Sequence, residues 1–156
     1  MRSILAKAFI GLAIASIGMF GANNEIGTWK MNVAKSKFTP ADSNPIKSQT
    51  LVRQAIDGGS KGTGTGERQD GTAINWSYSV KYDGKEYPVT GAAWDTISVK
   101  QKDANTFTVE LKKTGGKYHT TGRSVISKDG KTNTITAKGT NAEGQPTSRN
   151  SIYEKQ

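Results

Sequence analysis

INWSYSVKYDGKEYPV, residues 74–89, alternates apolar and polar side chains as far as an Asp-Gly pair and then starts a second apolar series. A period of two places the apolar set on one face of a β-strand and the polar set on the other. Asp83-Gly84 accepts the positive φ angles of a two-residue hairpin turn. Tyr87 and Val89 begin the return strand. The stretch therefore predicts an antiparallel hairpin with one buried face.

The same pattern recurs along most of the chain. Further strands are predicted at residues 27–33, 47–56, 96–102, 106–113, 117–126 and 148–154, and one through Ile135 and Ala137. Ala34 to Pro45 contains Pro40 and is predicted to be a connection rather than a strand. Strands joined by short turns pair antiparallel, and a long sheet with one apolar face buries it by closing. We therefore expect a single antiparallel up-and-down β-barrel of about eight to ten strands, with a β-sandwich as the alternative.

A glycine-rich run, residues 58–66, precedes the central hairpin. Its spacing matches neither a phosphate-binding P-loop nor a dinucleotide-binding turn, and no helix pattern follows it. Glycine inside a strand marks a bend or a bulge. The run is therefore predicted to be a weak, bent strand or a mobile rim.

The N-terminal residues 1–22 have the layout of a secretory signal. Arg2 and Lys7 come before an apolar run from Ala8 to Ala22 that contains no acidic residue. An uncleaved membrane anchor is the alternative. The expected domains are a signal peptide at 1–22 and a barrel at 23–156, and the expected location is periplasmic or secreted. Without cysteine, the barrel must depend on its apolar core and not on disulfides.

The formal charge of +9 comes from Lys and Arg scattered over strands and turns. No basic helix or RNA-binding motif is present, so nucleic acid is not an expected partner. Weak contact with anionic components of a cell envelope stays open.

Several motifs resemble known families. Gly27-Thr28-Trp29 is similar to the G-x-W that opens the barrels of the lipocalin and fatty-acid-binding-protein superfamily, and also to the start of biotin-binding barrels. The ending Ile152-Tyr153-Glu154-Lys155 resembles the last strand of the fatty-acid-binding proteins. Together with YDGKEYPVTG, residues 82–91, and SKDGK, residues 127–131, these motifs resemble exported bacterial lipocalin-like proteins of unassigned activity. The resemblance implies a ligand-binding barrel.

The resemblance also implies where a ligand would be held. In fatty-acid-binding proteins, an inward Arg two residues before the Tyr of the last strand grips the ligand carboxylate; here Ser151 has that place and Arg149 lies two residues further back on the same face. Arg149 could instead cap Trp29, as a late Arg does in lipocalins, and Arg123 could do the same. The expected ligand-binding residues are Trp29, Trp76, Tyr78, Tyr82, Tyr87, Phe107, Arg149 and Tyr153.

Catalysis is not indicated. A multi-His zinc site cannot be built from the single His119. A Ser-His-Asp triad would have to use His119, but nothing near it resembles a nucleophile elbow, and it lies in a run typical of a rim or surface. Haem ligation through His119 is a remote alternative. Most aspartates precede glycine in turns, and no carboxylate pair is poised as acid and base. We expect no catalytic residue, metal or cofactor.

Two hypotheses of function remain, with a barrel cyclase or isomerase as a weaker third. The first is an exported barrel that binds a small hydrophobic or amphipathic molecule, gated by the glycine-rich run and the loop that carries Trp94. The second is a packed barrel that acts through its surface as an inhibitor or envelope-binding module. An exposed Trp94 would favour the second.

Overall fold

A computed structural model describes residues 23–41 and 45–156 of the chain, so the predicted signal peptide lies outside the described residues. The strands are β1 (Gly27–Met31), β2 (Lys37–Thr39), β3 (Ile46–Ile56), β4 (Gly59–Arg68), β5 (Ala73–Lys81), β6 (Asp83–Thr90), β7 (Thr96–Asp103), β8 (Thr106–Lys112), β9 (His119–Ile126), β10 (Thr132–Thr140) and β11 (Pro146–Lys155). No helix in this part of the chain is long and apolar enough to cross a membrane.

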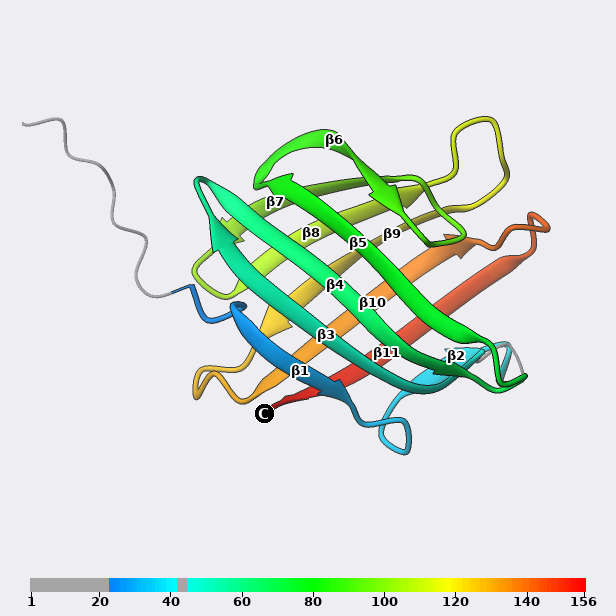
Figure 1. The fold of residues 1–156 in the computed structure, drawn as a ribbon, viewed down its shortest axis with the longest axis horizontal. Helices are drawn as coiled ribbons and strands as arrows, with labels where there is room; N and C mark the ends of the chain where they lie inside the picture. The colour runs from blue at the N-terminus through cyan, green and yellow to red at the C-terminus, as the bar shows by residue number, and fades with distance from the viewer. Residues whose placement is uncertain (1–22, 42–44) are drawn as a thin grey trace, which may run out of the picture.

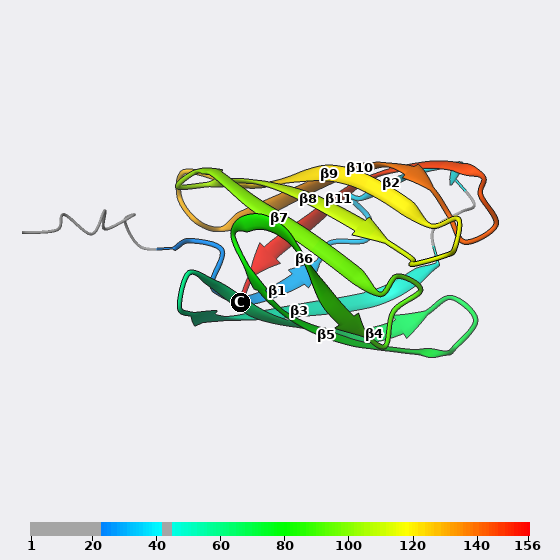
Figure 2. The same cartoon turned by 90° about the horizontal axis from the view of Figure 1, so that it is seen from above.

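The strands close into one antiparallel barrel. From β3 to β11 each strand pairs with the next, and β1 pairs with both β3 and β11, which closes the sheet (Figure 1). Seen from above, β1, β3, β4 and β5 form one side and β9, β10 and β11 the other, with the interior between them (Figure 2). The prediction of a closed up-and-down barrel is confirmed, and the sandwich alternative is wrong.

β2 was not predicted. Within the segment expected to be a connection, Lys37, Phe38 and Thr39 pair antiparallel with β11, outside the closed circuit. A segment this short carries too few residues to show a period of two, and the prolines on its C-terminal side favoured a loop. The partner strand, and not the local sequence, decides its conformation.

The central hairpin has the predicted register but an incomplete ladder. Tyr78 faces Val89 and Ser77 faces Thr90, which is the register that a two-residue turn at Asp83-Gly84 gives. Gly84 takes a φ of +80°, as such a turn needs. Between these pairs and the turn, β6 pairs with β7 and arches away from β5 (Figure 1).

Two apolar clusters fill the barrel. The first contains Trp29, Met31, Ile46, Leu51, Ile74, Ile126 and Tyr153. The second contains Val80, Val89, Ile97, Val99, Phe107 and Leu111. Because strands from opposite sides contribute to the first cluster, its burial holds the closed sheet together.

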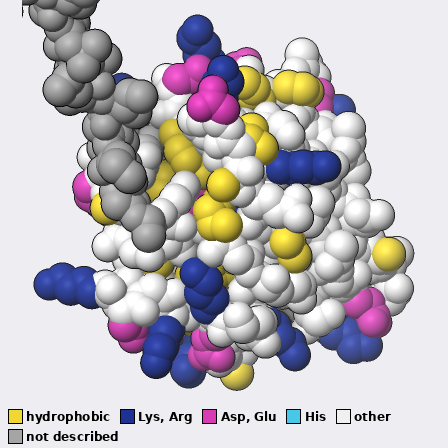
Figure 3. Space-filling model, turned by 60° about the vertical axis from the view of Figure 1, so that its left-hand side comes forward, with side chains coloured by type: hydrophobic (Ala, Val, Ile, Leu, Met, Phe, Trp, Pro, Cys, Tyr) yellow, Lys and Arg dark blue, Asp and Glu magenta, His cyan; other side chains and the backbone are white. Residues whose placement is uncertain are grey.

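Charged side chains are interspersed on the surface. Figure 3 shows Lys and Arg scattered among acidic and neutral side chains on the face it presents. Several of these form exposed ion pairs, such as Lys112–Glu86 at 2.5 Å and Lys47–Glu67 at 2.8 Å. Exposed pairs of this kind contribute little to stability, so the fold rests on its core.

Candidate functional site

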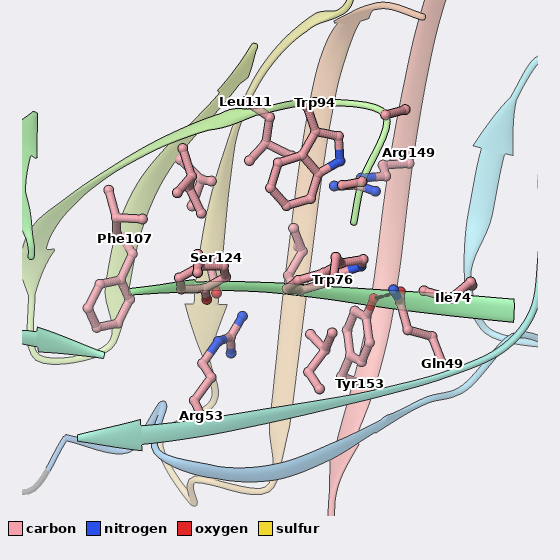
Figure 4. A pocket seen from close by; sticks show the side chains of 18 of the residues that line it. Gln49, Arg53, Ile74, Trp76, Trp94, Phe107, Leu111, Ser124, Arg149 and Tyr153 are labelled. Atoms are coloured by element: carbon pink, nitrogen blue, oxygen red, sulfur yellow. Dashed lines mark hydrogen bonds between the residues drawn. The ribbon is translucent and has the colours of Figure 1, made fainter. Parts of the chain in front are cut away.

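The barrel contains a cavity of about 250 Å³. Its mouth is bordered by the loops near Pro45, Ala92–Trp94 and Tyr118, and it extends inward to Phe107, Tyr82 and Glu25. Its walls are mostly apolar and aromatic, with a few polar groups among them (Figure 4). This combination is typical of a small-molecule site.

Two rings of β5 form one wall of the cavity. Trp76 and Tyr78 are stacked with their centroids 5.8 Å apart and their planes 12° from parallel. Gly64 and Gly62 of β4 lie opposite them in the ladder. A Cβ at Gly64 would come within 2.2 Å of the Trp76 ring, and one at Gly62 within 2.4 Å of the Tyr78 ring. The two glycines therefore leave the space in which the rings lie against β4.

This arrangement revises the prediction for the glycine-rich run. β4 is a regular ten-residue strand that pairs along its length with β3 and β5, and not a mobile rim. The irregularity that glycine predicted lies at this end of the strand: Gly66 has a φ of +155° and faces Gln49, and the register with β3 shifts just beyond it, between Ile46 and Ser48. The period of two could not show this role, because glycine has no side chain to assign to a face.

Trp94 lies on the loop between β6 and β7 and turns inward. Its ring meets Trp76 at 5.4 Å with an angle of 58°, and it borders the mouth of the cavity (Figure 4). Trp94 is half-buried and packs against the second cluster. The hypothesis that Trp94 is a rigid exposed contact on the surface loses its support.

The inner end of the cavity carries an acid and a phenol. Glu25 is buried, and its carboxylate accepts a hydrogen bond from the Tyr82 hydroxyl, which also accepts one from Asn23 Nδ2 at 3.3 Å. Burial, reinforced by the Glu25 carboxylate, raises the pKa of Tyr82 well above its ordinary value. The Tyr82 ring meets Phe107 edge to face at 5.2 Å. The residues before β1 therefore help to close this end.

Arg53 is the buried cation of the cavity. It comes from β3, is 9% exposed, and directs its guanidinium toward Ser124 across the interior (Figure 4). Burial lowers the pKa of Arg53, but Tyr78 and Glu25 stabilise the charge and leave the pKa raised. Among the described residues, its Nη1 has no hydrogen-bond partner. A buried guanidinium nitrogen without an acceptor is costly, so this position favours an acceptor.

Tyr153 and Arg149 of β11 also face the cavity. The Tyr153 hydroxyl donates a hydrogen bond to Gln49 Oε1 at 2.7 Å, and burial raises the pKa of Tyr153 to about 12. The Tyr153 phenol interacts electrostatically with both Arg149 and Arg53. Arg149 is half-buried and lies beside Trp94, closer to the mouth (Figure 4). The cavity lining thus has one buried cation, Arg53, and two half-buried ones, Arg149 and Arg68.

Six of the eight predicted ligand-binding residues line this cavity: Trp76, Tyr78, Tyr82, Phe107, Arg149 and Tyr153. Trp29 and Tyr87 do not. Trp29 is fully buried in the first cluster, where its Nε1 donates to the Glu25 carbonyl at 2.8 Å. Tyr87 is half-buried, and its hydroxyl donates to Asp83 Oδ2 at 2.9 Å on the surface.

The cation on Trp29 also differs from the prediction. Lys155 Nζ lies 5.1 Å from the centre of the indole, in the place proposed for Arg149 or Arg123. Trp29 and Lys155 face each other in the pairing of β1 with β11, which brings the lysine to the ring. Arg149 is therefore available to the cavity, and Arg123 is exposed.

Arg53, Glu25 and Gln49 are cavity residues that the sequence prediction did not include. A signal for two of them was present, because Gln49, Leu51 and Arg53 alternate and share the inner face of β3. The signal was obscured by Val52, which made the phase of the strand ambiguous. Glu25 precedes the first strand, so no periodicity could place it.

His119 lies at the surface, as predicted. Its Nε2 is 2.7 Å from Glu110 Oε1, and more than half of its side chain is exposed. It is absent from the residues that line the cavity, so haem ligation inside the barrel is not supported by its position.

Comparisons with known proteins match the fold alone. No protein-family model matches the sequence, and neither does any curated protein. A Schistosoma mansoni fatty acid binding protein, solved in complex with arachidonic acid, aligns over 87% of this chain and 99% of its own with a TM-score of 0.54 and 16% identity. EF1p2_mFAP2b, solved bound to DFHBI, aligns over 88% of this chain and 98% of its own with a TM-score of 0.52 and 10% identity. The chain has the fold of the fatty-acid-binding-protein and lipocalin barrels.

Proposed function

We propose that this protein is an exported binding protein that holds a small hydrophobic or amphipathic molecule inside its barrel. The observation that carries the proposal is the cavity of about 250 Å³ between stacked aromatic rings and a buried arginine. A barrel that only had to be stable would fill this space, because packed interiors leave few voids larger than a water molecule. The two structural neighbours were solved with an organic molecule bound, which agrees with the proposal.

The shape and chemistry of the walls indicate what kind of ligand fits. Trp76, Tyr78 and Trp94 offer flat apolar surfaces, which suit an alkyl chain or an aromatic ring. Arg53 and the hydroxyl groups of the tyrosines offer polar contacts at particular places. An amphipathic molecule uses both, whereas a purely apolar one would leave the buried arginine without an acceptor.

Binding, and not catalysis, is what these residues support. The polar groups of the cavity are largely engaged with one another, as Tyr82 is with Glu25 and Tyr153 with Gln49. No nucleophile with an adjacent base lines the described cavity. The N-terminal pattern of residues 1–22 supports export, and an exported protein would meet its ligand in the periplasm or outside the cell.

Native mass spectrometry of the protein from its own compartment, with tryptophan fluorescence titration, tests the proposal. We expect a co-purifying small molecule, and quenching of the cavity tryptophans when it is added back. Val109→Phe should abolish binding, because Val109 lines the cavity. Thr108→Phe, one residue away and absent from the cavity lining, is the matched control and should bind normally.

Three results would overturn the proposal. One is a protein that carries no small molecule and binds none from a panel of fatty acids, alcohols and aromatic compounds. A second is equal binding by the wild-type and Val109→Phe proteins. The third is a loss of binding in the Thr108→Phe control as large as in the cavity variant.

A further inference from the structure

We infer that Arg53 is the anion-binding residue of the cavity, so that the ligand is an organic acid whose carboxylate enters first and whose apolar part lies against Trp76 and Trp94. This inference rests on the proposed function and specifies the class of ligand. It assigns the polar contact to β3, and not to the arginine of β11 that the family resemblance would favour.

Arg53 is a buried cation with an unpartnered donor. The residue is 9% exposed, and Nη1 has no partner within the described residues. Arginine presents five N–H donors in a planar fork that matches a carboxylate, and it does not lose its proton in a protein. A charged guanidinium held in a mostly apolar cavity therefore stabilises an anion placed beside it.

The lining of the cavity carries more positive than negative charge. Its lining includes the arginines Arg53, Arg68 and Arg149 and one acid, Glu25. Arg68 Nη1 already donates to the carbonyl of Ala73 at 2.7 Å. Glu25 accepts the hydrogen bond of Tyr82 and also stabilises the charge of Arg53, so it offsets one of the three positive charges. The interior keeps an excess of positive charge that an anionic ligand would neutralise.

Ser124 lies on the far wall of the cavity from Arg53, and its hydroxyl is already engaged. Ser124 Oγ donates to Asn133 Oδ1 at 2.8 Å, and the amide nitrogen of Asn133 is buried and without a partner among the described residues. Arg53 points toward Ser124 across the cavity (Figure 4). Asn133 does not line the cavity, so among the described lining residues Arg53 Nη1 is the unpartnered donor, which agrees with an acceptor and not with a cation.

Aromatic side chains line the path from the mouth of the cavity to Arg53. Arg149 lies closer to the mouth and is half-buried, so water screens its charge more than that of Arg53. Between the mouth and Arg53 stands the wall of Trp94, Trp76 and Tyr78. An acid that reaches Arg53 therefore leaves its hydrocarbon part along this wall.

The test compares decanoate with decanol, which have chains of the same length and differ in charge. Affinities are measured by tryptophan fluorescence and calorimetry on the wild-type, Arg53→Met, Arg149→Met and Arg123→Met proteins. We expect wild-type protein to prefer decanoate, and Arg53→Met to lower decanoate affinity about tenfold or more with little change for decanol. Arg149→Met should have a smaller effect. Arg123→Met, an exposed control, should have none.

Equal binding of decanoate and decanol by the wild-type protein would overturn the inference while leaving the proposed function intact. The inference would also be overturned if Arg53→Met bound decanoate as tightly as wild type, or if Arg149→Met lost more decanoate affinity than Arg53→Met. The proposed function would stay intact in both cases. Failure of the wild-type protein to bind either probe or any of the wider panel would overturn both proposals.

If Arg53→Met does not fold, two further measurements test whether Arg53 binds the carboxylate. Arg53→Lys keeps the charge and loses the fork, so it should bind decanoate with intermediate affinity and still prefer it to decanol. In the wild-type protein, the guanidinium NMR signal that is absent from Arg53→Lys should shift with decanoate and stay in place with decanol. A signal that moves with neither probe contradicts the inference.

Discussion

Trp29 and Trp76 both point into the barrel from neighbouring parts of the sheet, yet one fills the interior and the other lines a cavity. Trp29 faces Leu51 on β3 and is fully buried in the first cluster. Trp76 faces Gly64 on β4, lies against the glycine and remains half-buried beside Trp94. The residue across the ladder therefore decides whether an inward ring becomes packing or a binding surface.

The largest expected effect separates the two tryptophans. Trp29→Ala should lower the free energy of unfolding by about 3–5 kcal/mol, because it empties a fully packed site. Trp76→Ala should cost less than about 2 kcal/mol, since part of the ring is already exposed, but it should weaken ligand binding. Urea denaturation of both variants measures the difference. Equal losses of stability would mean that the two rings are equally well packed.

The second effect concerns alkaline pH. Burial raises the pKa of Tyr153 to about 12, above the ordinary value of 10.0. A raised pKa means that the folded state holds the phenolic proton more tightly, so this stabilisation is complete below about pH 10 and is lost as the pH rises toward 12. At about 1.4 kcal/mol per pKa unit, the loss reaches roughly 2–3 kcal/mol.

Tyr153→Phe provides the control for this pH dependence. Its unfolding free energy should fall less steeply between about pH 10 and 12 than that of the wild-type protein. Burial and Asp83 also raise the pKa of Tyr87, but its hydroxyl lies at the surface, so Tyr87→Phe should flatten the profile less than Tyr153→Phe. Chemical denaturation at several pH values compares the slopes. Parallel curves for the wild-type and Tyr153→Phe proteins would show that the first cluster does not shield this phenol from water.

The smallest effect tests the glycine directly. Gly64→Ala places a Cβ within 2.2 Å of the Trp76 ring, so we expect the ring to shift, a loss of about 1–3 kcal/mol in stability and weaker ligand binding. Without the clash, the same substitution would stabilise a strand by lowering the entropy of the unfolded chain. A loss of stability in Gly64→Ala therefore indicates the clash with Trp76, whereas a gain of stability indicates that there is none.

Thr65→Ala, on the exposed face of the same strand, is the matched control and should leave both binding and the Trp76 fluorescence unchanged. Stability from urea denaturation and the emission spectrum of the tryptophans are the measurements. A Gly64→Ala protein that is more stable than wild type and binds its ligand normally would contradict the role given to the glycine-rich strand.

The sequence by itself determined the closed antiparallel barrel and most of its inward residues. Alternation reports which face of a strand a side chain occupies, and the Asp83-Gly84 turn sets the hairpin register, because both depend on neighbouring residues. Alternation also made Gln49 and Arg53 detectable in principle on the face of Leu51.

The tertiary structure alone decided the rest. Whether Trp29 packs or lines a cavity depends on its partner across the ladder, and the cation over its ring came from Lys155 at the far end of the chain. β2 exists because β11 offers it hydrogen bonds, and Glu25 reaches the interior because the segment before β1 folds over the end of the barrel. Each of these depends on residues far apart in the chain, and a local pattern carries no information about distant partners.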